Sequence, residues 1–169
     1  MSFLVAGEVP AEYVSMMLEE MELDGRDARD VSLEHISEEQ RAAFPVLVIG
    51  AGMSGILAGI RLQEQGIPYL IIEKNAGVGG TWYENTYPGC RVDVGNHFYC
   101  YSFEPNNDWS EFFARQPELR RYFEHCARKY GLLPNIRFET EVLRARYDEA
   151  SGSWAVTVRT TAGLSLIHL

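Results

Sequence analysis

The chain has few cysteines, no surplus of basic residues and no long hydrophobic run. Its three cysteines, Cys90, Cys100 and Cys126, are odd in number and lack CxxC spacing, so we expect free thiols in a reducing, cytoplasmic compartment. No run of about 18 apolar residues is present, which argues against a membrane span. The acidic N-terminus lacks a basic segment followed by an apolar core, so a signal peptide is not expected.

The net charge of -9 is concentrated at one end of the chain. Residues 1–44 hold 11 acidic and 3 basic side chains, whereas residues 45–169 hold 13 and 12. A nearly neutral main portion without a basic patch is not typical of a protein that binds nucleic acid. The shift in charge predicts two parts, an acidic extension (1–44) and a main domain (45–169).

The acidic extension is predicted to be helical. Pro10 suits the first turn of a helix that ends at Asp24-Gly25, and a second short helix is predicted to begin at Ser37. Apolar residues of the first helix recur at helical spacing: Tyr13, Val14, Met17 and Leu18. Two interpretations stay open, an arm that mediates dimerisation and, more simply, an extension packed over the main domain.

With 169 residues, 46% of them hydrophobic, the chain is long enough for one domain with a core. The main domain opens with a strand–helix–strand pattern. Val46–Ile49 is a continuous aliphatic run, typical of a parallel strand buried on both faces. A helical pattern covers Met53 to Gln65 and is stopped by Gly66, and a second strand, Tyr69–Ile72, ends at Glu73.

The turn between this strand and helix has the glycine spacing of a dinucleotide-binding site. Gly50 would permit the tight turn, Gly52 the approach of a pyrophosphate, and Gly55 close packing of helix and strand. The helix N-terminus favours an anion there. Glu73 stands where an acid accepts hydrogen bonds from ribose hydroxyls, which favours FAD or NAD over NADP. The alternative is an ordinary strand-to-helix turn.

The remainder of the chain is predicted to contain one long irregular segment, one helix and several strands. Asn75 to Asp93 is rich in glycine and aromatic residues and shows no sustained periodicity, which is typical of a functional loop. The other predicted elements are a helix over Pro117–Tyr130, a strand over Ile136–Val142, a hairpin of Leu143–Tyr147 and Trp154–Arg159 with a loop of five or six residues, and the start of a strand in Ala162–Leu169.

Three motifs together, GAGMSG, GGTWYENTYPGCRVD and FYCYSF, carry a resemblance to a known family. Over about residues 45–160 the sequence resembles the class B flavoprotein monooxygenases, and more narrowly the N-terminal part of a Baeyer-Villiger monooxygenase of the acetophenone-oxidising type. The resemblance implies an α/β, Rossmann-like FAD/NAD(P)-binding domain, with a parallel sheet, helices and a β-meander, that is incomplete at its C-terminus.

The resemblance also implies a set of site residues. Asp93 matches an active-site aspartate near the flavin, and Arg91 to Asp93 would face the nicotinamide of NADPH. The implied cofactor-binding residues are Gly50, Gly52, Met53, Ser54, Gly55, Glu73, Lys74, Gly80, Thr81, Trp82, Asn85, Arg91, Asp93 and Tyr99. In this family NADPH reduces FAD, and the reduced flavin uses O2 to convert a ketone into an ester.

The sequence departs from the family pattern in two respects. Many members have Trp and Arg where this chain has Glu84 and Thr86, which leaves the substrate open. The chain also ends before a second GxGxxG, the catalytic arginine and the FxGxxxHxxxW fingerprint, so we expect it not to complete the reaction alone. A module that binds FAD or an adenine nucleotide without turnover is one alternative. An NAD-dependent dehydrogenase is another, which the GGTW and YPG motifs disfavour.

Several prominent residues also have simpler interpretations. As a set, the aromatic residues of the loop are more typical of a core than of cofactor contacts: Trp82, Tyr83, Tyr87, Phe98, Tyr99 and Tyr101. Cys90 is expected to be a small apolar filler, and without the family Asp93 is more simply a turn cap near Gly95. The four histidines share no metal-ligand spacing, so no metal site is expected.

Overall fold

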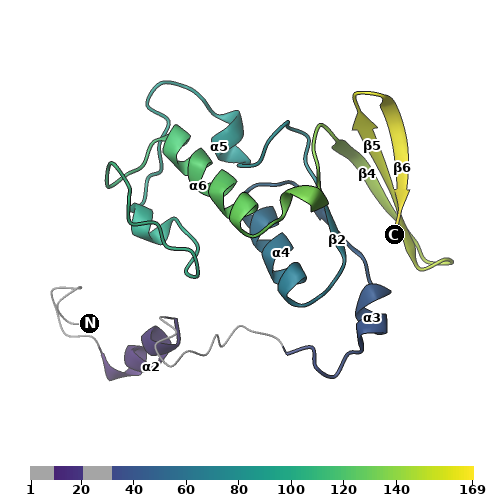
Figure 1. Cartoon of the computed structure of the whole chain (residues 1–169), viewed down its shortest axis with the longest axis horizontal. Helices are drawn as coiled ribbons and strands as arrows, with labels where there is room; N and C mark the ends of the chain where they lie inside the picture. Colours follow the sequence, from purple (N-terminus) through teal and green to yellow (C-terminus); the bar gives the residue numbers. More distant parts are fainter. Residues whose placement is uncertain (1–9, 21–31) are drawn as a thin grey trace. The chain divides into compact units, whose positions relative to one another are not determined.

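The structure, a computed structural model, describes residues 10–20 and 32–169, in two units, Met1–Ile36 and Ser37–Leu169. In the first unit, helix α2 (Ala11–Glu20) confirms the helix predicted after Pro10, while its predicted end at Asp24-Gly25 lies outside the described residues (Figure 1). In the second unit, α3 (Glu38–Ala42) confirms the predicted short helix. Ser37 caps it by accepting a hydrogen bond from the backbone of Gln40, whose side chain accepts one in return.

A parallel three-stranded sheet forms the centre of the second unit. Its strands are β1 (Val46–Ile49), β2 (Tyr69–Ile72) and β3 (Ile136–Arg137), in the order β1-β2-β3. Helix α4 (Met53–Glu64) connects β1 to β2, as the sequence predicted, and its ends agree with the expected helix to within one residue. The carboxyl ends of β1 and β2, Ile49 and Ile72, pair directly and therefore lie at one edge of the sheet.

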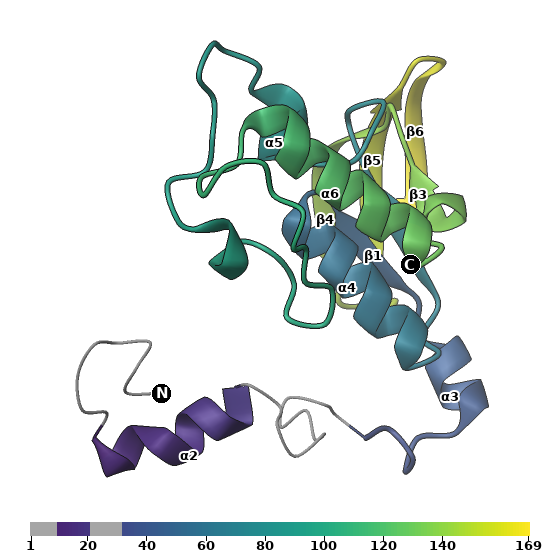
Figure 2. The same cartoon turned by 60° about the vertical axis from the view of Figure 1, so that its left-hand side comes forward.

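Two helices cover one face of this sheet. Helix α6 (Gln116–Lys129) has the predicted proline near its start, and it lies beside α4 in both ribbon views (Figures 1 and 2). Ile60, Ile71 and Phe123, from α4, β2 and α6, are fully or almost fully buried in the same cluster. The buried face of α6 includes Leu119, Tyr122, Phe123 and Cys126, and Tyr130 just after the helix is partly buried.

An antiparallel meander covers the opposite face of the sheet. It consists of β4 (Glu141–Asp148), β5 (Ser153–Thr160) and β6 (Gly163–His168), in that order, and it lies behind the parallel sheet in Figure 2. Val156 and Val158 of β5 pack with Ile72 of β2 in a second buried cluster. Since successive side chains of a strand point to opposite faces, β2 supplies Ile71 to one cluster and Ile72 to the other.

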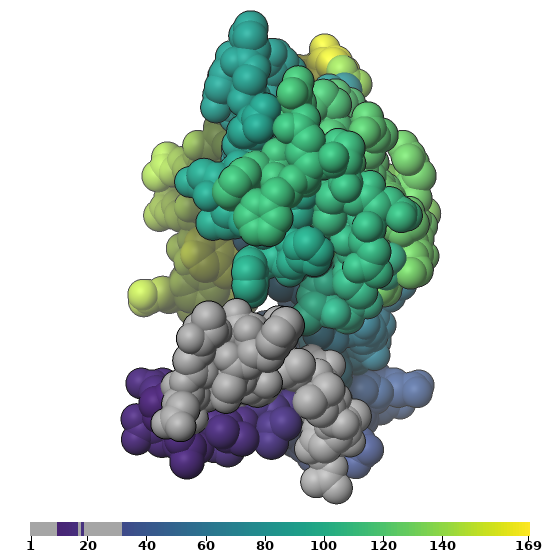
Figure 3. All heavy atoms as spheres, turned by 90° about the vertical axis from the view of Figure 1, so that its left-hand side faces the viewer, coloured from purple at the N-terminus to yellow at the C-terminus, as the bar shows by residue number. Residues whose placement is uncertain are grey.

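The segment between β2 and α6 is mostly irregular, which confirms the prediction for Asn75 to Asp93, and it contains two short helical turns. These are α5 (Thr81–Glu84) and a 3-10 turn at Asn96–Phe98; a third short turn, Leu133–Asn135, precedes β3. In Figure 3, residues from α5 to α6, coloured teal to green, make up much of the visible face of the second unit.

The prediction of one strand over Ile136–Val142 is wrong, because the chain bends between β3 and β4. Glu139 has a left-handed backbone, with φ of 50°, which ends the parallel pairing, and Glu141 then starts a strand of the other sheet. The hairpin that follows is confirmed, but its loop is shorter than expected, because Asp148 pairs directly with Ser153. The predicted last strand is confirmed as β6.

The prediction that Val46–Ile49 is buried on both faces is confirmed only in part: Val48 packs against the first buried cluster and Leu47 against the second, but the burial is incomplete. The first three residues of β1 are only partly buried, and the side chain of Ile49 is 62% exposed. In the sheet order β1-β2-β3 the strand stands at the edge, with β2 as its only strand partner among the described residues. A run of aliphatic residues shows that a strand is hydrophobic, but its full burial also requires a neighbouring strand on each side.

Candidate functional site

The turn between β1 and α4 has the conformation that its glycines predicted. Gly50 has φ of +94°, which a side chain would strain. A Cβ on Gly55 would overlap the backbone carbonyl oxygen of Gly50, so only glycine allows the helix to pack this close to the turn. Gly52 is the N-cap of α4 and has no capping side chain, which leaves the helix N-terminus open.

A cavity of about 310 Å3 lies at this turn, at the carboxyl ends of the parallel strands. Among the residues that line it are Gly50, Gly52 and Gly80. A Cβ on Gly52 would lie 3.5 Å from the Cα of Gly80, and a Cβ on Gly50 would project into open space. The backbone thus forms a cradle that side chains would fill. A diphosphate fits such a cradle, because backbone N–H groups at a helix N-terminus attract anions.

Glu73 forms the acidic wall of this cavity. It is buried, with 3% of its surface exposed, and follows directly after β2. Its Oε2 accepts a hydrogen bond from the backbone N–H of Ala51 at 2.7 Å, and its Oε1 accepts one from the N–H of Asn75 at 2.8 Å. Each carboxylate oxygen can accept a further bond, so the group is fixed in place yet retains acceptor capacity for ribose hydroxyls.

The residues beside Glu73 form an exposed ion pair at the cavity wall. The Lys74 ammonium lies 2.9 Å from Oε1 of Glu84, and the side-chain amide of Asn75 donates to the same oxygen at 2.9 Å. The hydrogen bonds from Asn75 and then Lys74 hold the pKa of Glu84 below its ordinary value. The hydrogen bond to Glu84 raises the pKa of Lys74. Both Lys74 and Glu84 line the cavity.

Trp82 and Tyr99 belong to the core of the loop. The Trp82 indole N–H donates to the Tyr99 hydroxyl at 3.2 Å, and the two rings meet edge to face. The buried Gln116 at the start of α6 donates from its side-chain amide to the Trp82 carbonyl oxygen. Thr81 and Asn85 are exposed at the two ends of α5, where the Asn85 amide donates to the Thr81 carbonyl oxygen at 2.9 Å.

The structure brings some predicted site residues together and leaves others apart. Gly50, Gly52, Glu73, Lys74 and Gly80 line one cavity, and the predicted Met53, Ser54 and Gly55 form the first turn of α4 beside it. The remaining predicted residues, Thr81, Trp82, Asn85, Arg91, Asp93 and Tyr99, are not among those that line it.

Arg91 and Asp93 lie on the outer part of the loop. The Arg91 guanidinium is 3.3 Å from the Glu111 carboxylate, and Arg91 forms an isolated antiparallel bridge with Arg115. Asp93 is exposed, while Val92 between them is buried and anchors the segment. An exposed carboxylate at this position is accessible to a bound molecule.

The expectation that the loop aromatics form a core is correct only in part. Trp82 and Tyr101 are buried, and Tyr83 and Tyr99 are partly buried. Tyr87 and Phe98 are instead 62% and 88% exposed. Cys90 is buried, as expected of an apolar filler.

Sequence reasoning missed the far wall of the cavity, which Thr140, Glu141 and Val142 form. It also gave no site role to Glu84. The available signal was topological: a third strand parallel to the second ends at the same edge of the sheet, so the residues after it lie close to Glu73. The Thr140 N–H donates to the Glu73 carbonyl oxygen at 2.9 Å.

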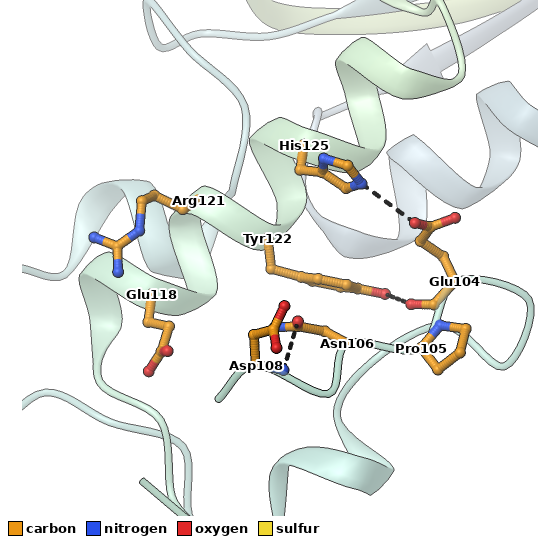
Figure 4. A pocket seen from close by; sticks show the side chains of 8 residues that line it. All are labelled: Glu104, Pro105, Asn106, Asp108, Glu118, Arg121, Tyr122 and His125. Carbon is orange, nitrogen blue, oxygen red and sulfur yellow. Dashed lines mark hydrogen bonds and ion pairs between the residues drawn. The ribbon is translucent and has the colours of Figure 1, made fainter. Parts of the chain in front are cut away.

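A second, polar cavity of about 420 Å3 lies between the loop and α6 (Figure 4). On its wall the carboxylate of the buried Glu104 accepts hydrogen bonds from Lys129 at 2.6 and 2.8 Å and from Tyr130 at 2.9 Å. The His125 ring nitrogen lies 3.2 Å away. The bond from Lys129 is the main reason that the pKa of Glu104 is lowered. Through these three hydrogen bonds the carboxylate ties the loop to the end of α6.

Within residues 10–20 and 32–169, no group of three or more His, Cys, Asp or Glu side chains could hold a metal ion. No helix in the described part of the chain is long and apolar enough to cross a membrane. Burial raises the pKa of the Cys126 thiol to about 11, which keeps it protonated and unreactive near neutral pH.

Comparison with known proteins identifies a matching domain family and relatives of similar sequence. Residues 48–116 match the family of NAD(P)-binding Rossmann-like domains. The chain is 43% identical over 159 residues to an uncharacterized monooxygenase of Sinorhizobium fredii, covering 94% of this chain and 23% of that protein. It is 48% identical over 110 residues to a Baeyer-Villiger monooxygenase of Pseudomonas aeruginosa, covering 64% of this chain and 21% of the relative.

Solved structures agree with this fold. The crystal structure of OTEMO in complex with FAD and NADP is 38% identical, with a TM-score of 0.68. That match covers 75% of this chain and 24% of OTEMO. The chain therefore has a Rossmann-like fold and spans about a quarter of the length of the proteins that it matches.

Proposed function

We propose, on the premise that this chain is a homologue of the Baeyer-Villiger monooxygenases, that it binds FAD as part of an NADPH-dependent flavoprotein monooxygenase. Its substrates would be a small ketone and O2. The observation that carries the proposal is the glycine-lined cavity with Glu73 fixed on its wall. It combines an anion cradle with a ribose acceptor at the carboxyl edge of a parallel sheet, where dinucleotides bind.

The residues of the cavity would each hold one part of the cofactor. Gly50, Gly52 and Gly80 allow the diphosphate to approach the backbone, and the open N-terminus of α4 attracts its negative charge. Glu73 would accept hydrogen bonds from the ribose hydroxyls. The bound flavin would supply the redox chemistry with NADPH and O2.

We assign the flavin end to the loop that follows. Thr81, Trp82 and Asn85 of α5 and its cap would lie along the flavin side of the cofactor, and the hydrogen bond to Tyr99 would hold the Trp82 ring in place. Asp93, exposed on the same loop, would act at the flavin, beside Arg91. A negative carboxylate there would hold a cationic partner or the nicotinamide end of NADPH in place.

The principal alternative is a module that binds FAD without turnover. It is supported by the extent of the match, which is about a quarter of each relative's length. NADPH consumption that depends on oxygen and ketone would establish turnover by this chain. Retained flavin without that activity would favour the alternative.

The test of binding is an absorbance spectrum of the purified chain from about 300 to 550 nm, after addition of FAD and desalting. We expect flavin bands in the wild type and none in Gly52→Val, whose side chain would fill the cradle beside Gly80. Gly66→Ala, outside the cavity, has open space around its Cβ but strains the backbone at φ of +66°, so it controls for a glycine substitution that costs stability without filling the cradle. A folded wild-type chain that retains no flavin would refute the proposal.

We further propose that the protein works in the cytoplasm, as its free cysteines favour, and that the extension contributes to a homodimer. The second proposal is supported by α2, on which Tyr13, Val14 and Leu18 are exposed. Val14→Glu should lower the mass measured by light scattering to that of a monomer. A monomeric wild type would refute dimerisation.

A further inference from the structure

The cavity proposed to hold FAD contains a lysine in a position to attract a further phosphate. Lys74 follows directly after Glu73 and lines the same cavity. Dinucleotide domains that accept a 2'-phosphate place a cation near the ribose, usually where other domains have the ribose-binding acid. On position alone, Lys74 could serve a 2'-phosphorylated nucleotide as that cation.

Glu84 engages this lysine within the protein. Its Oε1 lies 2.9 Å from the Lys74 ammonium and also accepts a hydrogen bond from the Asn75 amide at 2.9 Å. Lys74 and Asn75 come from the segment after β2, whereas Glu84 is the last residue of α5, so the contacts join both sides of the loop. The Asn75 amide thus helps to keep the Glu84 carboxylate in contact with the lysine.

The charge of the cavity wall adds to this effect. Three carboxylates, Glu73, Glu84 and Glu141, line the cavity, and Lys74 is the one basic residue among those lining it. Glu141 also pairs with Arg159 at 3.1 Å, but Arg159 does not line this cavity. The wall is therefore net acidic where an adenosine ribose would lie, and its lysine is already paired.

We infer that Glu84 is a specificity-determining residue, which pairs with Lys74 and so restricts the cavity to adenine nucleotides whose ribose lacks a 2'-phosphate. The inference rests on the proposed nucleotide site and assigns its ligand class. Diphosphates with free ribose hydroxyls, such as FAD and ADP, bind. Adenosine 2',5'-bisphosphate and NADP are rejected, because a 2'-phosphate meets Glu73 and finds Lys74 occupied.

The ion pair between Lys74 and Glu84 is suited to selecting between nucleotides more than to stabilising the folded chain. The side chains of Lys74 and Glu84 are 57% and 41% exposed. Exposed pairs are screened by water and contribute little to folding. Once its partner is removed, an exposed lysine attracts a neighbouring phosphate about as strongly as it attracted the carboxylate. This attraction corresponds to about a fivefold gain in affinity for the 2'-phosphorylated nucleotide.

The test compares NAD with NADP, which differ only by the 2'-phosphate, by isothermal titration calorimetry at low salt. The wild-type chain should bind NAD at least about 10-fold more tightly than NADP. In Glu84→Gln, which preserves the acceptor for Asn75 but removes the charge, this preference should fall about fivefold. Glu64→Gln removes an exposed carboxylate that pairs with Arg61 and does not line the cavity, and it should leave the preference unchanged.

A double variant, Lys74→Gln with Glu84→Gln, separates attraction of the 2'-phosphate by the unpaired lysine from the mere loss of a negative charge on the cavity wall. The wild-type preference should return when both charges are absent. An unchanged preference in Glu84→Gln would overturn the inference, as would a loss of preference that persists in the double variant. If the wild type bound neither nucleotide, the proposed function would fail too, whereas NAD binding with no effect of Glu84 on the preference would overturn the inference alone.

Discussion

Two buried carboxylates, Glu73 and Glu104, each lie on the wall of a cavity, and their partners differ in kind. Glu73 accepts one backbone N–H on each oxygen. Glu104 accepts from Lys129 on both oxygens and, in addition, from Tyr130, with His125 close by. The comparison teaches that burial alone does not identify a binding group. A carboxylate held by the backbone retains acceptor capacity, whereas one surrounded by side-chain donors serves to connect elements.

The largest expected effect concerns the glycine turn between β1 and α4, whose Ala51 N–H donates to the Glu73 carboxylate. In Gly55→Ala the new Cβ would overlap the Gly50 carbonyl oxygen, which cannot move without displacing the turn. We expect the free energy of unfolding to fall by about 3 kcal/mol, as for an overpacked core. Urea denaturation followed by circular dichroism measures it.

Gly131→Ala is the matched control. Gly131 has φ of +68° with open space around it, so the substitution imposes backbone strain without a collision. We expect a loss of about 1 kcal/mol. Equal losses in the two variants would contradict the role of close packing at Gly55.

Removal of the charge of Glu104 should lower the free energy of unfolding but leave FAD binding at the glycine-lined cavity unchanged. In Glu104→Gln the bonds from Lys129 lose their ionic partner, and we expect unfolding to become easier by about 2 kcal/mol. FAD affinity should stay within about twofold, because Glu104 does not line the glycine cavity. Glu124→Gln, on the same helix as Lys129 and in partly exposed pairs with Arg120 and Arg128, should cost less than about 1 kcal/mol.

The smallest effect is the dependence of stability on pH. Because Lys129 lowers the pKa of Glu104 in the folded chain, the unfolded chain binds more protons in acid. The contribution is present above the ordinary glutamate pKa and is lost as the pH falls through the lowered value. Between about pH 3 and 5, stability should therefore decline less steeply in Glu104→Gln than in the wild type. Parallel declines in urea titrations would contradict this.

The part of the site that sequence predicted is local. The run from β1 to Glu73 contains its own signals, since the glycines, the helix and both strands are contiguous in the chain. Both the left-handed Gly50 and the steric requirement at Gly55 follow from that spacing. This strand–helix–strand part of the fold was accordingly predictable from about 30 contiguous residues.

The parts that sequence missed depend on contacts between distant segments. Thr140 reaches the cavity only because β3 pairs with β2 and the chain then bends at Glu139. The Glu104 cluster joins the loop to the end of α6, and no periodic pattern marks such a pairing. The exposure of β1 likewise depends on which strands are present beside it, and not on its own residues.

The most direct test of the account is a comparison of FAD affinity in three chains, the wild type, Glu73→Gln and Glu104→Gln, by quenching of flavin fluorescence. We predict that Glu104→Gln binds like the wild type and that Glu73→Gln loses at least about 10-fold, because its amide cannot accept on both sides. Folding of each variant is verified by circular dichroism. Equal affinity in Glu73→Gln and the wild type, or an equal loss in both variants, would contradict the assignment of Glu73 as the binding carboxylate.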